Sequence, residues 1–153
     1  MPDWVWGVGL GFVALLLGGG FFLFTNLSGG GGGGCGKALP RLPGNVQVNA
    51  QGFQQEDDSM TLVIDYLNRS DLDNAFSNFY GDTHAFTHNI DPDIRGVNEE
   101  KAKSLCEAVL DIEGKLDPPP GTPRSPAAMA TSATKLRDQL RDVAVALGYP
   151  RPE

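Results

Sequence analysis

SPAAMATSATKLRDQLRDVAVALGYP, residues 125–150, has the pattern of one long amphipathic α-helix. Ser125 followed by Pro126 is a typical helix start. Gly148, with Pro150 after it, is a typical helix end. The apolar positions recur every three or four residues and so share one face of a helix. They are Met129, Ala133, Leu136, Leu140, Val143 and Leu147.

Three further segments repeat this helical period. The first is Ser59–Asn68, and the second begins with a capping-box pattern at Ser70 and is ended by Pro92. The third begins at Asn98 and ends before Pro118. No stretch alternates between apolar and polar residues with the period of a strand. The connections are short, so the sequence predicts an all-α fold, a small antiparallel helical bundle.

A long apolar segment, WVWGVGLGFVALLLGGGFFLFT, occupies residues 4–25 and carries no charge. A helix of this length spans about 33 Å, enough to cross a hydrocarbon core of about 30 Å. Trp4 and Trp6 lie where aromatic side chains favour the membrane interface. We expect one N-terminal transmembrane helix in residues 1–26. The alternative, a cleaved signal peptide, lacks its basic first region and its small-residue cleavage site.

Small residues within this segment form a stripe. The stripe, spaced 4, 3 and 4 residues apart, consists of Gly7, Gly11, Ala14 and Gly18. Small residues on one face let a second membrane helix approach closely. The stripe predicts an integral membrane protein complex as partner. The alternative is that glycine is simply common in membrane helices.

Between the apolar segment and the bundle the chain is rich in glycine and proline. Six consecutive glycines occupy Gly29–Gly34, and no helical period is sustained afterwards. Such compositions are typical of flexible linkers. The predicted organisation is therefore a transmembrane helix (1–26), a flexible linker (27–56) and a helical bundle domain (57–153).

The net charge is −7. An acidic chain is poorly suited to nucleic acid, because binding there requires basic groups that neutralise phosphates. No pattern for a small-molecule substrate is evident either. Lys37 and Arg41 are the first basic residues after the apolar segment. The positive-inside rule then favours a cytoplasmic bundle domain, on the evidence of two charges.

The two cysteines, Cys35 and Cys106, are too few for a disulfide framework. Cys35 lies in the predicted linker and Cys106 in a predicted helix. A bond between them would tie a flexible linker to a core helix. We therefore expect two free thiols, with a single disulfide as the alternative.

The only histidines, His84 and His88, stand four residues apart, so a helix projects both from one face. Two such imidazoles can bind one transition metal ion when other elements supply further ligands. The alternative is a polar face without metal or cofactor, whose histidines bond to solvent or carboxylates. The candidate further ligands are Asp82, Asp91, Glu107 and Cys106.

No pattern in the sequence indicates an activated nucleophile or a phosphate-binding loop, so we expect no enzymatic activity and no cofactor. The first functional hypothesis is a non-catalytic accessory subunit of a membrane protein complex, with the bundle as its docking domain. The alternative is a membrane-tethered metal-binding or redox carrier domain that uses His84 and His88.

Overall fold

The computed structural model describes residues 34–153. The predicted transmembrane helix, with its stripe of Gly7, Gly11, Ala14 and Gly18, lies outside the described residues, as does the first part of the linker. None of the helices within residues 34–153 has the length and hydropathy that a membrane crossing requires. The described part is entirely helical and contains no strand, which confirms the predicted all-α bundle.

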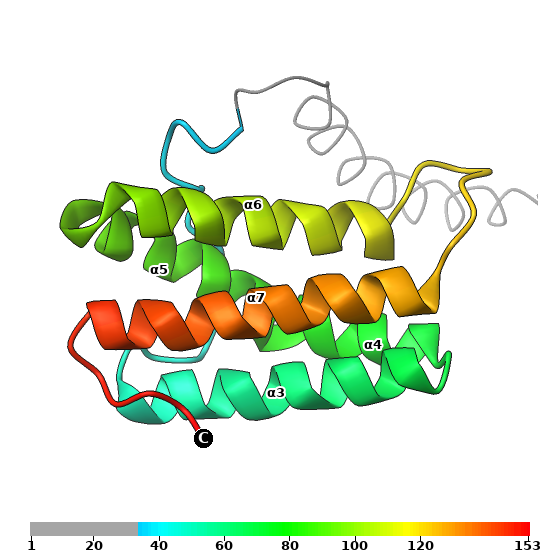
Figure 1. The fold of residues 1–153 in the computed structure, drawn as a ribbon, viewed down its shortest axis with the longest axis horizontal. Helices are drawn as coiled ribbons and strands as arrows, with labels where there is room; N and C mark the ends of the chain where they lie inside the picture. The colour runs from blue at the N-terminus through cyan, green and yellow to red at the C-terminus, as the bar shows by residue number, and fades with distance from the viewer. Residues whose placement is uncertain (1–33) are drawn as a thin grey trace, which may run out of the picture. The chain divides into compact units, whose positions relative to one another are not determined.

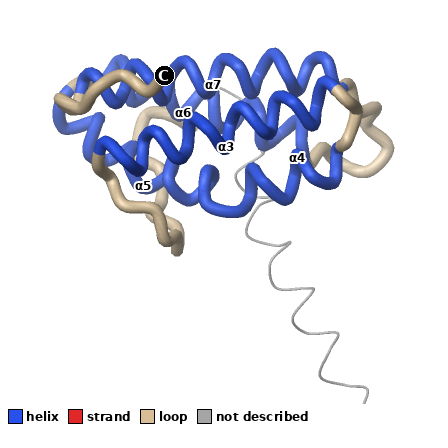
Figure 2. Tube along the Cα trace, turned by 90° about the horizontal axis from the view of Figure 1, so that it is seen from below, coloured by secondary structure: helices blue, strands red, loops and turns tan. Residues whose placement is uncertain are grey.

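The helices follow one another in an up-down-up-down arrangement (Figure 1). Helix α7 packs against both α3 and α6, while α4 packs against α3 and α5 against α6. Figure 2 shows α3, α6 and α7 as the long members of the bundle. In chain order the elements are α3 (Ala50–Asn68), α4 (Leu72–Asn78), the π-helical turn η1 (Phe79–Thr83), α5 (His84–Val97), α6 (Glu99–Leu116) and α7 (Pro126–Ala146).

Helices α6 and α7 have the ends that their sequences predict. Asn98 caps α6 by accepting a hydrogen bond from Lys101 N at 3.0 Å. Ser125 caps α7 in the same way, and Gly148 ends it with a φ of +86°, a conformation that glycine adopts without strain. The predicted apolar faces of both helices lie in the core. Their buried residues include Ala102, Leu105, Val109, Ile112, Leu116, Met129, Ala133, Leu136, Leu140 and Val143.

Helix α3 begins at Ala50, nine residues before its predicted start, so the end of the predicted 27–56 linker belongs to the bundle. The side chain of Asn49 caps the helix by accepting a hydrogen bond from Gly52 N at 2.8 Å. A side chain on Gly52 would lie 1.9 Å from the carbonyl oxygen of Gln47, so only glycine fits this close approach. The first half of this helix, AQGFQQEDD, could not be predicted from apolar periodicity, because its inward face carries only one large apolar residue, Phe53.

The predicted second helix is interrupted in one place and extended in another. Its cap is Asp71, not Ser70, because Ser70 has a φ of +59° and the Asp71 side chain accepts from Asn74 N. At η1 the backbone of Gly81 leaves the helical region, with a ψ of −106°. The helix does not end at Pro92 as expected but continues through it to Val97.

Residues 35–49, which we call the strap, pack on the bundle before α3 begins. Cys35 forms a disulfide bond with Cys106 of α6, with a Cα–Cα distance of 5.7 Å. The expectation of two free thiols is therefore wrong. It assumed that the chain around Cys35 is a free tether, whereas the side chains of Cys35 and Leu39 are buried in the hydrophobic core.

Candidate metal site

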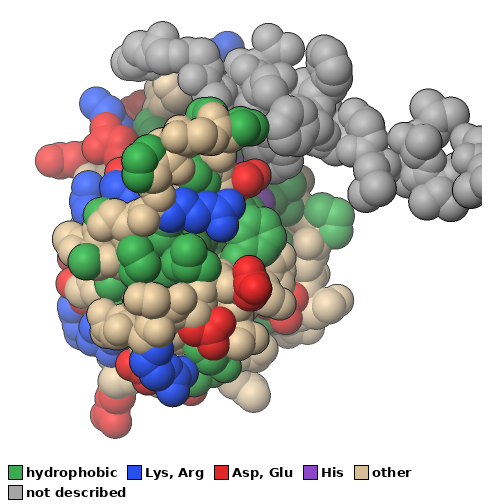
Figure 3. All heavy atoms as spheres, turned by 90° about the vertical axis from the view of Figure 1, so that its right-hand side faces the viewer, with side chains coloured by type: hydrophobic (Ala, Val, Ile, Leu, Met, Phe, Trp, Pro, Cys, Tyr) green, Lys and Arg blue, Asp and Glu red, His purple; other side chains and the backbone are tan. Residues whose placement is uncertain are grey.

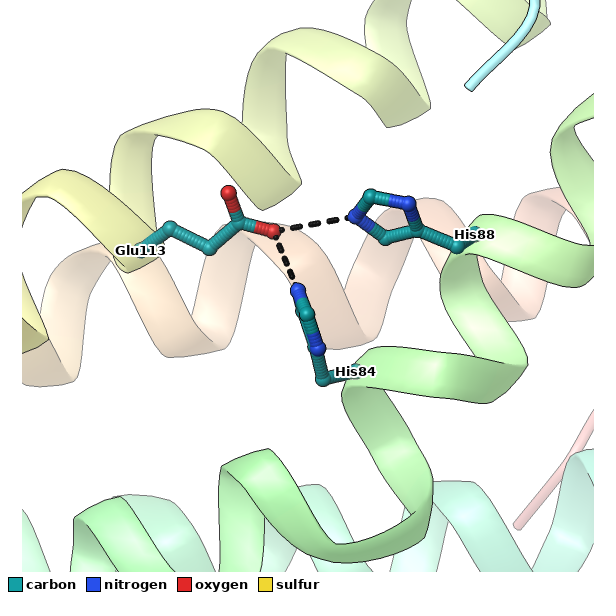
Figure 4. Close-up of side chains that lie close together, drawn as sticks. All are labelled: His84, His88 and Glu113. Carbon is teal, nitrogen blue, oxygen red and sulfur yellow. Dashed lines mark hydrogen bonds and ion pairs between the residues drawn. The ribbon is translucent and has the colours of Figure 1, made fainter. Parts of the chain in front are cut away.

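The site lies between α5 and α6. His84 and His88 occupy successive turns at the start of α5, on the face toward α6. Glu113 lies in the last turns of α6, which runs antiparallel to α5. Figure 4 shows all three side chains pointing toward one another. Within residues 34–153 they form the one group of three such side chains whose donor atoms converge, all within 4.8 Å of one another.

Both imidazoles point to the same carboxylate oxygen. Nε2 of His84 lies 2.9 Å from Oε1 of Glu113, and Nε2 of His88 lies 3.2 Å from it. The two imidazole rings contact each other, with centroids 4.6 Å apart. Three donor atoms thus surround one point between the helices.

The other ring nitrogen of His88 is held by the strap. Nδ1 of His88 lies 3.0 Å from the carbonyl oxygen of Pro40. A carbonyl oxygen can only accept, so Nδ1 must carry the proton. In a neutral His88 the lone pair of Nε2 then faces the Glu113 carboxylate, which is electrostatically unfavourable. The arrangement calls for a positive charge between them, either a second proton on His88 or a metal ion.

His84 supplies a second sign of this requirement. Its Nε2 is buried and lies 2.9 Å from Glu113 Oε1, a close polar contact, but it has no well-formed hydrogen bond. A buried nitrogen without a hydrogen-bond partner is uncommon in folded proteins. A positive charge at this place, either a proton or a metal ion, would satisfy both the nitrogen and the carboxylate.

The distances suit a small transition metal ion. Zinc binds imidazole nitrogen at about 2.0–2.1 Å and carboxylate oxygen at about 2.0–2.2 Å, which places tetrahedral ligand atoms about 3.4 Å apart. The nitrogen–oxygen separations of 2.9 and 3.2 Å are slightly shorter, whereas the three donor atoms together lie within 4.8 Å of one another, so binding requires the carboxylate to move outward and the two imidazoles to adjust. Three protein ligands leave the fourth tetrahedral position for water or an exchanging ligand.

The site is nearly closed to solvent. The side chains of His84, His88 and Glu113 keep 10%, 9% and 13% of their surface exposed. Figure 3 shows a small area of histidine between hydrophobic and acidic side chains on one face of the domain. The ring of Tyr80 packs edge-on against His84, with centroids 5.0 Å apart. Low exposure strengthens every charge interaction within the site.

Burial and the neighbouring charges shift two acidic groups here. Burial by itself would raise the pKa of Glu113, but the contacts with His84 and His88 outweigh it and hold that pKa below its usual range. Burial raises the pKa of Tyr80, and the Glu113 charge raises it further. Glu113 is therefore ionised and Tyr80 neutral at pH 7. A carboxylate in the ionised form is the form that binds metal.

None of the four further ligands expected from the sequence joins the two histidines. Asp91 pairs with Arg95 through two hydrogen bonds of 3.1 and 3.2 Å. Cys106 is in the disulfide, and exposed Glu107 lies 3.9 Å from Lys103. Asp82 lines a separate polar hollow between α3 and η1.

Glu113 was missed, although the topology offered a signal. Asn98 separates the two helices, and Glu113 lies almost as far after it as His84 lies before it. In an antiparallel pair joined by a tight connection, residues equidistant from that connection face each other. The same rule also admits Glu107, and the helical face alone distinguishes them. The contribution of Pro40 has no sequence signal, because any residue carries a carbonyl group.

No family model, curated protein or solved structure matched this chain when it was compared with all three. His84, His88 and Glu113 form the group of side chains whose chemistry indicates what the described domain can bind.

Proposed function

We propose that this chain is a metal-binding protein whose helical domain holds one divalent transition metal ion through His84, His88 and Glu113. The observation that carries the proposal is the fixed tautomer of His88. Its Nδ1 proton is committed to the Pro40 carbonyl, which leaves the Nε2 lone pair directed at the centre of the site. A histidine that binds a metal ion through one ring nitrogen usually donates a hydrogen bond from the N–H of the other, often to a backbone carbonyl.

Zinc is the ion that suits these ligands best. Imidazole nitrogen is a good ligand for zinc, copper, iron and nickel, whereas an oxygen-rich site would select magnesium or calcium. Two imidazoles with one carboxylate are a known zinc ligand set. The near closure of the site favours holding or transferring an ion over acting on a large substrate. We propose a carrier or storage role, tethered to a membrane if residues 4–25 span one.

The disulfide bears on the compartment. Disulfide bonds persist in oxidising compartments and are rare in the reducing cytosol. The Cys35–Cys106 bond therefore favours a domain on the outer, oxidising side of a membrane. This proposal replaces the cytoplasmic orientation, which had only Lys37 and Arg41 in its favour.

Zinc binding should depend on Glu113. We expect the full-length chain, purified in detergent and stripped with chelator, to bind one zinc ion per chain in a calorimetric titration. Glu113→Gln should weaken zinc binding at least about 100-fold. Loss of a residue that only hydrogen-bonds to a metal ligand typically costs 10- to 100-fold in affinity, and loss of a ligand itself should cost more. Cobalt should give a tetrahedral absorption spectrum in the unchanged chain that this variant lacks.

Glu107→Gln is the matched control, since this exposed glutamate lies on the same helix and changes the net charge equally. It should bind zinc like the unchanged chain. If both variants bind zinc as the unchanged chain does, or if both lose zinc binding, Glu113 is not the ligand that we assign. Absence of zinc, cobalt and copper binding by the unchanged chain would refute the proposed function.

A second candidate function rests on the small-residue stripe of the predicted membrane segment. We propose that Gly7, Gly11, Ala14 and Gly18 pack against a helix of a larger membrane complex, as an accessory subunit would. Gly11→Leu should then remove the partners that co-purify in detergent, while Gly9→Leu, on the opposite helical face, should retain them. Equal recovery with both variants would speak against this subunit role, and the metal proposal would be unaffected.

A further inference from the structure

We infer that the Cys35–Cys106 disulfide controls the affinity of the metal site, so that reducing the bond releases the ion. This inference rests on the proposed metal binding and adds its regulation. The physical connection is the strap, which is covalently tied at Cys35 and supplies the carbonyl that orients His88.

The strap is held on α5 by hydrogen bonds between its backbone and side chains of that helix. The backbone nitrogen of Leu39 donates to Asp91 Oδ2 at 3.0 Å. Leu42 and Asn89 exchange two hydrogen bonds of 2.8 Å each, one in each direction between the strap backbone and the Asn89 amide. These contacts form a ladder along one edge of α5, and the metal ligand His88 lies within it.

Pro40 lies between the two attachment points of this ladder, and its carbonyl accepts from His88 Nδ1. The position of that carbonyl is therefore set by the strap and not by the helix that carries His88. If the strap leaves, His88 loses both the partner that fixes its tautomer and the contact that fixes its ring. The His88 ring can then rotate about its side-chain bonds, so Nε2 is no longer held in the orientation that binds the metal ion.

Apart from the peptide bond into α3 at its C-terminal end, the disulfide is the one covalent link between the strap and the bundle within residues 34–153, and it holds the N-terminal end. Without it, the burial of Leu39, the exposed Arg41–Asp93 ion pair and a few hydrogen bonds of modest net strength must offset the conformational entropy of ordering this segment. The two residues are far apart in sequence, with a separation of 71, so the bond restricts the chain strongly. Cys35 and Leu39 lie in the same hydrophobic core as the helices, but most of that core comes from α3, α5, α6 and α7, so we expect the reduced chain to keep its helices.

The switching step is thiol–disulfide exchange with a dithiol. One thiolate of the dithiol attacks the sulfur of Cys35, because this residue keeps a little exposed surface whereas Cys106 has none. The Cys106 thiolate leaves and takes up a proton. The second thiol of the dithiol then attacks the mixed disulfide and releases Cys35 as a thiol. Two electrons and two protons pass to the protein, and the dithiol becomes a disulfide.

Reduction should weaken zinc binding about 10- to 100-fold, the loss typical when a metal-bound histidine is deprived of its orienting partner. Linkage makes the effect reciprocal. Saturating zinc should therefore stabilise the disulfide by the same factor. For this two-electron couple, a factor of 10 to 100 corresponds to a reduction potential about 30–60 mV more negative.

The experiment compares zinc affinity in three states of the full-length chain in detergent: oxidised, reduced with a dithiol that is then removed anaerobically, and Cys35→Ser/Cys106→Ser. Competition with a chelating dye gives the dissociation constants, and circular dichroism reports whether the helices persist. We expect the reduced chain and the double variant to bind equally and 10- to 100-fold more weakly than the oxidised chain, with unchanged helix content. Agreement of these two states excludes new thiolate ligands as the cause.

A second variant tests the strap while the disulfide is kept. Asn89→Ala removes both hydrogen bonds to Leu42 and should weaken zinc binding severalfold, whereas Asn78→Ala on α4 should not. Equal zinc affinity in the oxidised and reduced chains, or tighter binding after reduction, would overturn the inference and leave the metal site itself standing. If the oxidised chain binds no metal, the proposed function fails first. If the double variant unfolds, the Asn89→Ala variant decides. Unchanged zinc affinity in Asn89→Ala refutes the inference, whereas weaker zinc binding in Asn89→Ala but not in Asn78→Ala supports it.

Discussion

Phe53→Ala should lower the free energy of unfolding by about 3–5 kcal/mol, the usual cost of deleting a buried aromatic ring. The Phe53 side chain is 1% exposed. It packs edge-on against Phe86 of α5, with ring centroids 5.1 Å apart, and against Tyr149 at 5.4 Å. Truncation leaves a cavity where α3, α5 and the chain end after α7 meet. Urea denaturation followed by circular dichroism measures the loss.

Phe76→Ala is the matched control, because it deletes the same ring from the surface of α4, where 39% of the residue is exposed. It should cost less than about 1 kcal/mol. The comparison also tests where the bundle begins, because Phe53 lies within the segment that the sequence assigned to a flexible linker. Equal small losses from both substitutions would show that residues 50–56 do not belong to the core.

Asp57→Ala should cost about 3 kcal/mol of unfolding free energy. The Asp57 side chain is only 2% exposed and pairs with Arg141 of α7, at 2.5 Å to Nε and 2.7 Å to Nη2. Removing one partner of a buried ion pair leaves an uncompensated charge, at a typical cost of about 3–5 kcal/mol. We expect the lower end, since 22% of the Arg141 side chain reaches water. Thermal and urea unfolding both measure it.

Asp58→Ala, at the exposed neighbouring position, removes the same charge and should change stability by less than about 0.5 kcal/mol. Combining Asp57→Leu with Arg141→Met should restore much of the loss, because a well-packed apolar pair can replace a buried ion pair. A double variant as unstable as Asp57→Ala would show that shape, and not charge, governs this contact.

The parts of the fold that were predictable from sequence are those whose signals are local. Asn98, Ser125 and Gly148 act within one turn of the helix end that they define, so the bounds of α6 and α7 follow from the sequence. Pro92 shows the limit of such rules. Its missing hydrogen bond should end a helix, yet buried Ile90 and Ile94 on either side keep α5 continuous through tertiary packing.

The start of α3 and the path of the strap depend on contacts between distant residues. Glu56 and Asp57 lie in a polar stretch of sequence, yet both are buried, and Asp57 pairs with Arg141, far along the chain. The same limit applied to the proposed metal site. Its two histidines shared one local pattern, whereas Glu113 came from another helix and Pro40 contributed only its backbone.

The kink within η1 separates the orientation of α5 from that of α4. Gly81 has a ψ of −106°, outside the helical region, so α4 and α5 are two helices joined at this turn and not one continuous helix. A continuous helix would tie the direction of α5, and the face on which its side chains lie, to the axis of α4. His84 follows the kink directly, so the backbone angles of η1 decide which neighbouring helix the imidazole pair meets.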